Sequence, residues 1–404
     1  MSMDRRGFLV SAAGAAAGLA LLPETLPAAV RPSAGPVNLA IIGCGRQGRR
    51  LGIELIDKLG EGARVAAVCD LEERLARNLA GRARDAQVFT SYKELLDKAK
   101  DVQAVIVATP THLHKAVALD SVAAGKHVYC EAPLAHTPEE CAEIARAARG
   151  ASTVFAVGCE GRSNPIYQLA RTFYKTDAVR DSVSVYAQDH AKTTWGRPGD
   201  WWLDPATSIG LPGEKGVQQF DVAHWYRGSY PKEVEARGSI RLHQDGREVP
   251  DTVRATLRWA DGVELHYDAT IANSFGGRHE TFFNTNAAIK LAWTHGWMFK
   301  EPDSPQLGFE VYANRQQFHN DEGITLIADA TKLAAQGKLK EGVGLPNLSH
   351  YYALNDFLAA VSTGRAPACT ASEGARATMV AIRVNEAVKK GGTLTFDQAA
   401  LTGV

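Results

Sequence analysis

The stretch that decides the fold is Val37-Asn38-Leu39-Ala40-Ile41-Ile42-Gly43-Cys44-Gly45-Arg46-Gln47-Gly48. A mostly apolar run is followed by three glycines with the spacing G-x-G-x-x-G. We expect a strand to end at the first glycine and a helix to open in the loop, where backbone N–H groups can meet a pyrophosphate. The stretch therefore predicts a dinucleotide-binding unit whose cofactor contacts are Gly43, Gly45, Arg46, Gln47 and Gly48.

The pattern that surrounds this loop predicts an α/β fold with two domains. From residue 37 to about 157, short apolar runs alternate with helical patterns, which is typical of a doubly wound parallel sheet, a Rossmann domain over residues 35–157. From residue 158 the pattern of apolar and polar residues changes. Stretches between 234 and 293 in which apolar and polar residues alternate predict a large open antiparallel sheet in a C-terminal α+β domain over 158–404. Two helical patterns, 350–362 and 372–390, end the chain, and we expect the last helices to pack back on the first domain.

Residues at the ends of the later apolar runs bear on the choice of cofactor. Asp70 ends the run 64–69, where a carboxylate accepts hydrogen bonds from the adenosine ribose and repels a 2′-phosphate. The following Leu71-Glu72-Glu73 supplies no cation to offset it, so NAD is favoured over NADP. Thr109, Pro110 and His114 follow the fourth run and are expected at the same crevice.

The first 34 residues are predicted to be a twin-arginine export signal. Arg5-Arg6 precede an Ala/Gly/Leu run from Leu9 to Leu22, and small residues near Pro27–Ala29 suit cleavage. The alternative is a buried N-terminal helix. The run is too short to span a bilayer, so no membrane span is expected after cleavage. Because the twin-arginine export machinery carries folded proteins, we expect a periplasmic or otherwise exported protein that takes tightly bound NAD with it.

Composition argues against several partners. Lys and Arg together number 45, as do Asp and Glu, and no long run has one sign, so nothing favours nucleic acid or an anionic membrane. The six cysteines have no zinc-like spacing, and His112 with His114 is too weak a pattern for a metal. We expect no metal and no required disulfide.

Four segments together resemble the glucose–fructose oxidoreductase/inositol dehydrogenase/MocA family: the glycine loop, 108–110, 125–134 and 158–163. The resemblance extends over nearly the whole chain after the leader, including the tail 354–374. It implies a Rossmann domain followed by an antiparallel-sheet domain that often forms oligomer contacts, hence a homo-oligomer. It also implies an enzyme that oxidises or reduces a hydroxyl of a sugar, cyclitol or glycoside with NAD(P), with Glu131 at the cofactor.

The chain departs from this family at the catalytic positions. The family's Glu-Lys-Pro is Glu131-Ala132-Pro133 here, so the usual catalytic lysine is absent. The second family signature maps onto residues 214–221, where Gln218 stands in place of a histidine and cannot take a proton at neutral pH. The candidate replacements for the base are Glu214, Lys215, Asp221 and His224, and the candidate substrate contacts are Arg162, Asp189, His190 and Gln218.

Three functions stay open at this stage. If NAD never leaves, the redox cycle must close on one enzyme, either by transfer between two carbohydrates or by a redox-neutral glycosidase or lyase reaction of oxidation, elimination and reduction. A non-catalytic NAD-binding relative is the third reading, which the changes at Ala132 and Gln218 permit. The tryptophans at 195, 201 and 202 either stack on sugar C–H faces or anchor a loop.

Overall fold

The computed structural model describes residues 35–193, 196, 200–307, 310, 313–319, 321–328 and 344–404. The predicted export signal and Trp195 lie outside the described residues. Within the described ranges, no helix combines the length and the apolar character that a bilayer crossing requires.

The N-terminal domain is built on a six-stranded parallel sheet with the order β3-β2-β1-β4-β5-β6. This confirms the predicted doubly wound sheet, and the order reverses between β1 and β4, where such folds bind their ligand. The strands are β1 (Val37–Ile42), β2 (Ala63–Cys69), β3 (Gln87–Phe89), β4 (Ala104–Val107), β5 (His127–Cys130) and β6 (Phe155–Val157). The helices between them are α2 (Arg46–Asp57), α3 (Glu73–Ala80), α4 (Tyr92–Lys98), α5 (His114–Ala123) and α6 (Pro138–Gly150).

The C-terminal domain holds a ten-stranded sheet that is antiparallel except where β7 and β10 pair in parallel, which confirms the predicted open sheet. Four of its strands, β13 to β16, were not predicted from the sequence. In chain order the strands are β7 (Ser182–His190), β8 (Glu233–Ser239), β9 (Thr252–Arg258), β10 (Glu264–Thr270), β11 (Arg278–Asn284), β12 (Ala287–Leu291), β13 (Gly296–Lys300), β14 (Arg315–Phe318), β15 (Asp321–Thr325) and β16 (Thr393–Thr395).

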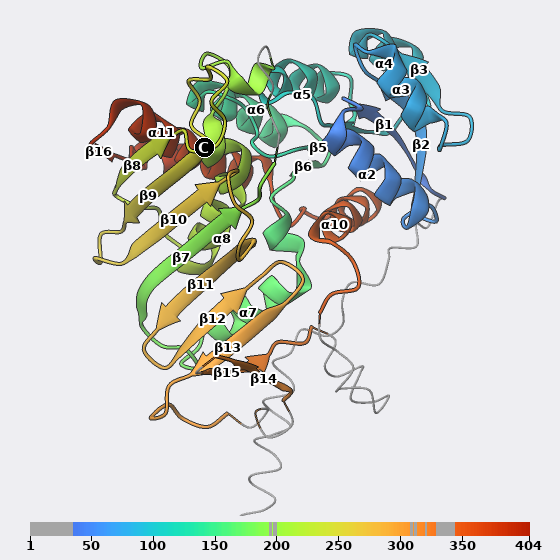
Figure 1. Ribbon diagram of the computed structural model, residues 1–404. Coiled ribbons are helices and arrows are strands. Elements are labelled where there is room, and N and C mark those ends of the chain that lie inside the picture. The colour runs from blue at the N-terminus through green and yellow to red at the C-terminus, as the bar shows by residue number, and fades with distance from the viewer. Residues whose placement is uncertain are drawn as a thin grey trace, which may run out of the picture.

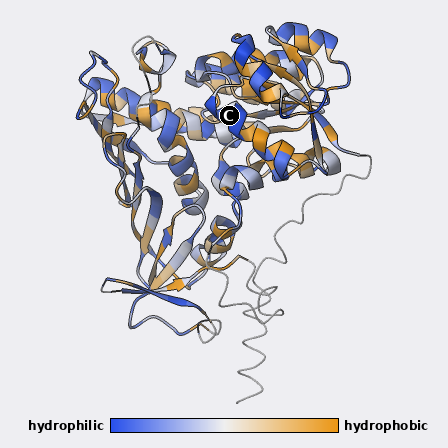
Figure 2. Cartoon of the chain, turned by 45° about the vertical axis from the view of Figure 1, so that its right-hand side comes forward, coloured by the Kyte–Doolittle hydropathy of each residue, from blue (hydrophilic) through white to orange (hydrophobic). Residues whose placement is uncertain are grey.

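Helices cover one face of this large sheet and join it to the Rossmann domain (Figure 1). They are α7 (Pro165–Tyr174), α8 (Val217–Arg227) and α11 (Ala371–Lys390). Helix α12 (Gln398–Gly403) packs on α11, and α10 (Ser349–Thr363) packs against the Rossmann domain instead. Figure 2 shows the two sheets as separate lobes, and most helices carry both hydrophobic and hydrophilic residues, as expected for helices with one buried face.

The C-terminal helices contact both lobes. Helix α11 packs against α6 of the Rossmann domain and against α8 and β8 of the second domain. Just before it, the N–H of Val157 donates to the carbonyl oxygen of Cys369 at 3.0 Å, so the chain extends the edge of the parallel sheet beyond β6. Helix α10 lies against α2, where His350 Nε2 is 3.2 Å from Glu54 Oε2.

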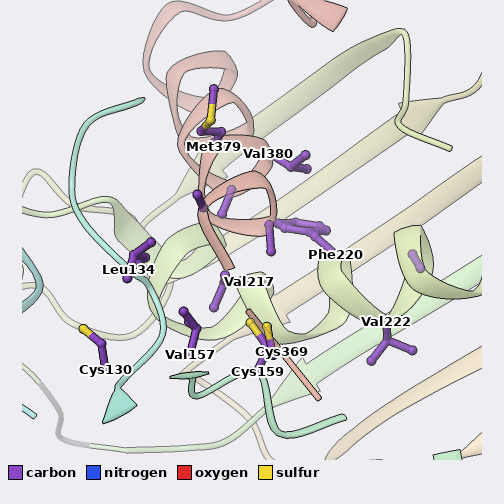
Figure 3. Packing of buried hydrophobic residues seen from close by; sticks show 14 of the residues in the cluster. Cys130, Leu134, Val157, Cys159, Val217, Phe220, Val222, Cys369, Met379 and Val380 are labelled. Carbon is purple, nitrogen blue, oxygen red and sulfur yellow. The ribbon is translucent and has the colours of Figure 1, made fainter. Parts of the chain in front are cut away.

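One continuous hydrophobic cluster runs from the Rossmann sheet through α11 to the helices of the second domain. Figure 3 shows part of it, in which Val157, Val217 and Phe220 meet α11 and the sulfur atoms of Cys159 and Cys369 lie side by side. All six cysteines are buried free thiols. Because this cluster is shared, the two domains fold against one another as one packed body.

Helix α11 packs so closely against β6 at Gly374 that a side chain cannot be added there without a clash. A Cβ at this position would lie 2.5–2.6 Å from the side-chain carbons of Val157. We therefore expect Gly374→Ala to lower the free energy of unfolding by about 1–3 kcal/mol through overpacking, as measured by urea denaturation. Gly150→Ala at the end of α6 is the matched control, because its Cβ would meet nothing within 4 Å. Equal stability of the two variants would contradict this view of the packing.

Candidate active site

A cleft of about 780 Å³ opens where the strand order of the parallel sheet reverses, and both domains line it. The Rossmann side supplies the ends of β1, β2, β4 and β5, and the second domain supplies residues from β7, α8 and β11. The predicted residues that line the cleft are Gly43, Gly45, Arg46, Gln47, Asp70, Thr109, Pro110, His114, Glu131, Asp189, Glu214, Lys215 and Gln218.

The glycine loop has the shape that a pyrophosphate needs. Gly43 has φ +91°, and a Cβ on Gly48 would lie 1.7 Å from the carbonyl oxygen of Gly43, so neither position accepts a side chain. A Cβ on Gly45 would meet nothing within 4 Å, which leaves open space beside the helix N-terminus. Gly45 is also the N-cap of α2 and has no side chain to cap it. The loop therefore fits a nucleotide phosphate.

Asp70 is held in place by the loop that it faces. Its Oδ2 accepts a hydrogen bond from the N–H of Cys44 at 2.7 Å, and its Oδ1 accepts from the N–H of Glu72 at 2.9 Å. Both Asp70 and Glu72 line the cleft, together with Arg46 and Arg50. The carboxylate is thus fixed at the end of β2, which is the position that contacts a ribose in this fold.

His114 joins the two loops that line the middle of the cleft. Its Nδ1 is 2.9 Å from the carbonyl oxygen of Pro133, and its Nε2 is 2.8 Å from that of Thr109. Burial lowers the pKa of His114. A neutral imidazole has one N–H, so one of these two contacts is a hydrogen bond and the other is a close approach of a ring nitrogen to a carbonyl oxygen. His114 therefore ties the two loops together through the backbone.

Glu131 is a buried acid beside the cofactor loop. Gln47 Nε2 donates to Glu131 Oε1 at 3.2 Å, and a Cβ on Gly158 would lie 2.9 Å from Glu131 Oε2. Burial, reinforced by the nearby Glu160 carboxylate, raises the pKa of Glu131 to about 8. A largely protonated carboxyl group is therefore expected here at neutral pH.

The second domain brings an acid and a cation into the cleft on one short turn. Residues Pro212–Gly216 form a π-helical turn before α8, a distortion that often marks functional sites. Glu214 Oε1 accepts a hydrogen bond from the hydroxyl of Thr111 at 2.9 Å, and burial raises the pKa of Glu214 to about 7. The neighbouring Lys215 donates from Nζ to Asp189 Oδ1 at 2.7 Å. The turn thus presents a proton acceptor and a donor side by side.

Gly48 and four further predicted site residues are not among the residues that line the cleft. Asp221 and Arg162 form a buried pair, in which the guanidinium Nε donates to Asp221 Oδ2 at 2.9 Å. His224 stacks on the ring of Tyr230, with centroids 3.7 Å apart. His190 Nε2 is 3.4 Å from Asp268 Oδ1, and His190 lines a different cavity on the outer face of the large sheet. Asp221, Arg162 and His224 thus have structural partners away from the cleft, whereas His190 Nε2 is buried and makes no hydrogen bond with the described residues.

Gln218 lines the cleft but both ends of its amide are occupied. Its Oε1 accepts from the N–H of Glu160 at 2.9 Å, and its Nε2 donates to the carbonyl oxygen of Gly158 at 2.6 Å. The residue that replaces the expected histidine therefore braces the end of β6 against α8.

The lining residues that were not among the predicted site residues include Thr111, Trp201, Arg278 and Trp293. Thr111 lies within the 108–114 segment that the sequence analysis examined, whereas the order and register of the large sheet bring Arg278 to the cleft. Trp202 is buried in the core, so of the two described tryptophans of that loop only Trp201 can face a sugar. Within the described ranges, no cluster of three or more His, Cys, Asp or Glu side chains could hold a metal.

Comparisons with known proteins agree with this architecture. A model for the "oxidoreductase family, NAD-binding Rossmann fold" matches residues 37–159, and a "GFO/IDH/MocA C-terminal domain" model matches residues 178–290. Inositol 2-dehydrogenase 2 of Saccharopolyspora erythraea is 40% identical over 241 residues, 59% of this chain and 68% of that protein. Inositol 2-dehydrogenase of Burkholderia multivorans is 39% identical over 281 residues, 69% of this chain and 78% of that protein.

A solved structure shares the fold. Levoglucosan dehydrogenase in complex with NADH and L-sorbose superposes with a TM-score of 0.73 at 19% identity, covering 90% of this chain and 99% of that one.

The raised pKa of Glu214 makes stability depend on pH in a defined direction. A carboxyl group whose pKa rises from 4.5 to about 7 on folding stabilises the protein below pH 4.5, and this contribution is lost as the pH rises through 7. We therefore compare the free energy of unfolding of Glu214→Gln with that of the wild type. Raising the pH from 4.5 to 8.5 should shift this difference by about 3 kcal/mol in favour of the variant. Urea denaturation at both values is the measurement, with the surface substitution Glu61→Gln as control. A constant difference across this range would contradict the burial of an ionisable Glu214.

Proposed function

We propose a function from one premise: this chain belongs to the GFO/IDH/MocA family of oxidoreductases, with an NAD-binding Rossmann fold. The protein oxidises or reduces a hydroxyl group of a sugar, cyclitol or glycoside with NAD. The names of its relatives, inositol and levoglucosan dehydrogenases, support this substrate class. The observation that carries the proposal is the turn that places Glu214 and Lys215 in the cleft that the glycine loop opens into.

The glycine loop and Asp70 would hold the cofactor. When bound, NAD supplies the hydride acceptor or donor. The fixed carboxylate of Asp70 favours the free ribose hydroxyls of NAD over the 2′-phosphate of NADP. Tight retention of NAD is part of the proposal, because the exported protein must keep the cofactor it left the cytoplasm with.

Glu214 is the proposed acid–base residue. A pKa of about 7 lets it take up and release a proton near neutral pH, which is the condition for efficient proton transfer. Its Oε1 accepts the hydrogen bond from the hydroxyl of Thr111, and its Oε2 is the atom that would meet a substrate hydroxyl. Thr111 therefore orients the carboxylate without using both of its oxygens.

Lys215 is the proposed replacement for the lysine that Ala132 displaces. Its ammonium group has three donors, of which one contacts Asp189. The remaining donors can polarise the substrate oxygen as charge develops on it. Asp189 keeps the ammonium in the cleft and acts as a positioning residue.

A redox-neutral glycosidase or lyase is the second candidate function. Elimination from an oxidised sugar needs a base for the C–H proton and an acid for the leaving group. Glu214 and Glu131 line the same cleft, and burial raises both pKa values, to about 7 and about 8. Two acids whose pKa values lie near neutrality favour this route over loss of chemistry.

Reduction of bound NAD by a carbohydrate is the direct test. The purified protein is mixed with cyclitols, sugars and aryl glycosides while NADH absorbance and released aglycone are followed. We expect at least one compound to form NADH, and Glu214→Gln to lower that rate by about 10²- to 10⁴-fold, since general acid–base catalysis is worth that much. Glu61→Gln is the control. Released aglycone selects the glycosidase route, and bound NAD that no compound reduces would refute an oxidoreductase role.

Export by the twin-arginine route is also part of the proposal. The paired arginines before an apolar run support it. We expect Arg5→Lys with Arg6→Lys to leave the protein in the cytoplasm, as seen by cell fractionation. Arg31→Lys, in the same leader but outside the pair, should not change its location. Export of the double variant at the wild-type level would contradict this assignment.

A further inference from the structure

We propose that Arg278 and Trp293 form an anion-binding subsite that selects substrates carrying a carboxylate, such as uronic acids. This inference rests on the proposed function, because it describes the substrate end of the same cleft. It names a substrate class that the names of the inositol and levoglucosan dehydrogenases do not specify.

The guanidinium of Arg278 is held rigidly at the cleft wall. Arg278 is the first residue of β11 and lies opposite Asp189 of β7 in the sheet register. Its Cζ is 4.0 Å from the centroid of the Trp293 ring, and its Nε is 3.4 Å from Asp189 Oδ2. Stacking and the ion pair fix the plane of the guanidinium, so little entropy is lost when a ligand binds.

Hydrogen-bond donors at this place have no acceptor among the described residues. Arg278 Nε and Trp293 Nε1 are both buried and lack a hydrogen-bond partner there. The Arg278 side chain as a whole is 29% exposed and lines the cleft. An unmade hydrogen bond from a buried donor costs about 1–3 kcal/mol, so a ligand that supplies acceptor oxygens is favoured.

The backbone at Trp293 is strained in a way that suits a binding site. Trp293 lies between β12 and β13 with φ +62°, in the left-handed region that non-glycine residues rarely adopt. Its carbonyl oxygen accepts a hydrogen bond from Asn164 Nδ2 at 2.6 Å, which holds this conformation. Strain of this kind persists where the surroundings enforce it and is concentrated at ligand sites.

The charges at this end of the cleft leave Arg278 without a full counter-charge. Asp189 makes its short contact with Lys215, at 2.7 Å, and only a longer one with Arg278. Glu280 lies near Arg278, but burial raises its pKa to about 7, as it does for Glu214. Lys215 and Arg278 therefore share the carboxylate of Asp189, and a substrate carboxylate would supply the missing counter-charge.

A carboxylate matches the guanidinium in shape as well as in charge. Arginine and carboxylate pair through two parallel N–H to oxygen bonds, which a single hydroxyl cannot reproduce. A neutral sugar would leave the guanidinium without an anionic partner. The subsite therefore discriminates between a sugar acid and its neutral analogue.

Matched pairs of ligands test this on the NAD-loaded protein. D-Glucuronate, D-galacturonate and D-mannuronate are each compared with the corresponding uronamide, in which a neutral carboxamide replaces the carboxylate. Binding is measured by calorimetry and NADH formation is followed in parallel. We expect at least one acid to bind roughly tenfold or more tightly than its amide, because only the carboxylate can form a hydrogen bond between two charged groups with Arg278.

Variants assign the preference to Arg278. Arg278→Gln should remove the acid preference and leave amide binding nearly unchanged, and Arg278→Lys should keep only part of it. Arg254→Gln is the matched control, since Arg254 lies on β9 at the outer face of the same sheet and is 77% exposed. The wild-type comparison of acid with amide does not depend on how any variant folds.

The outcomes separate this inference from the proposed function. Neutral sugars that reduce NAD while acids bind no better than amides would overturn the Arg278 subsite and leave the oxidoreductase intact. Acids that bind through Arg278 without forming NADH would support the subsite and count against the redox role. An acid preference that survives in Arg278→Gln would also overturn the assignment.

Discussion

A buried ion network centred on Arg162 fixes the arrangement on which the candidate site depends. Arg162 follows β6 in a short 3₁₀ turn, pairs with Asp221 of α8 and also contacts Glu373 of α11. Its side chain is 5% exposed and that of Asp221 is 1% exposed, so removal of either partner would leave a buried charge that costs about 3–5 kcal/mol. Because α8 continues directly from the turn that carries Glu214 and Lys215, this network sets where those two side chains meet the Rossmann domain.

The replacement of histidine by glutamine at 218 fits the same arrangement. A neutral amide can accept one hydrogen bond and donate another without changing protonation state. Gln218 does both, to the backbone of Glu160 and of Gly158, and so joins α8 to the segment that follows β6. The position that the resemblance assigns to a proton-carrying histidine is therefore a structural brace in this chain, and we propose that Glu214, one helical turn earlier, carries the proton instead.

The sequence was sufficient for the parts of the molecule that local pattern determines. Apolar runs and the glycine loop predicted the parallel sheet, and a signature segment pointed to Glu214 and Lys215, which line the cleft and whose catalytic roles stay predictions. The pairings of β7 with β10 and β11, which lie far from it in the chain, could not be predicted. The pairing of β7 with β11 brings Arg278 opposite Asp189. Asp221 and His224 were misleading for a related reason: their spacing on a helix says nothing about Arg162 or Tyr230, which occupy them from other segments.

The carboxyl groups around the cleft fall into two kinds, and the difference is physical. Asp189 and Asp221 each have a cation within hydrogen-bonding distance, Lys215 at 2.7 Å and Arg162 at 2.9 Å, and such pairs hold structure. Glu214 and Glu131 are buried and accept hydrogen bonds from neutral side chains, so desolvation dominates and raises their pKa values toward neutrality. When their surroundings give carboxyl groups different pKa values, those pKa values indicate which group can act as acid or base in an active site. In a cleft that lacks the usual lysine and histidine, the half-buried Glu214 is the proton carrier that we propose, because desolvation brings its pKa to about 7.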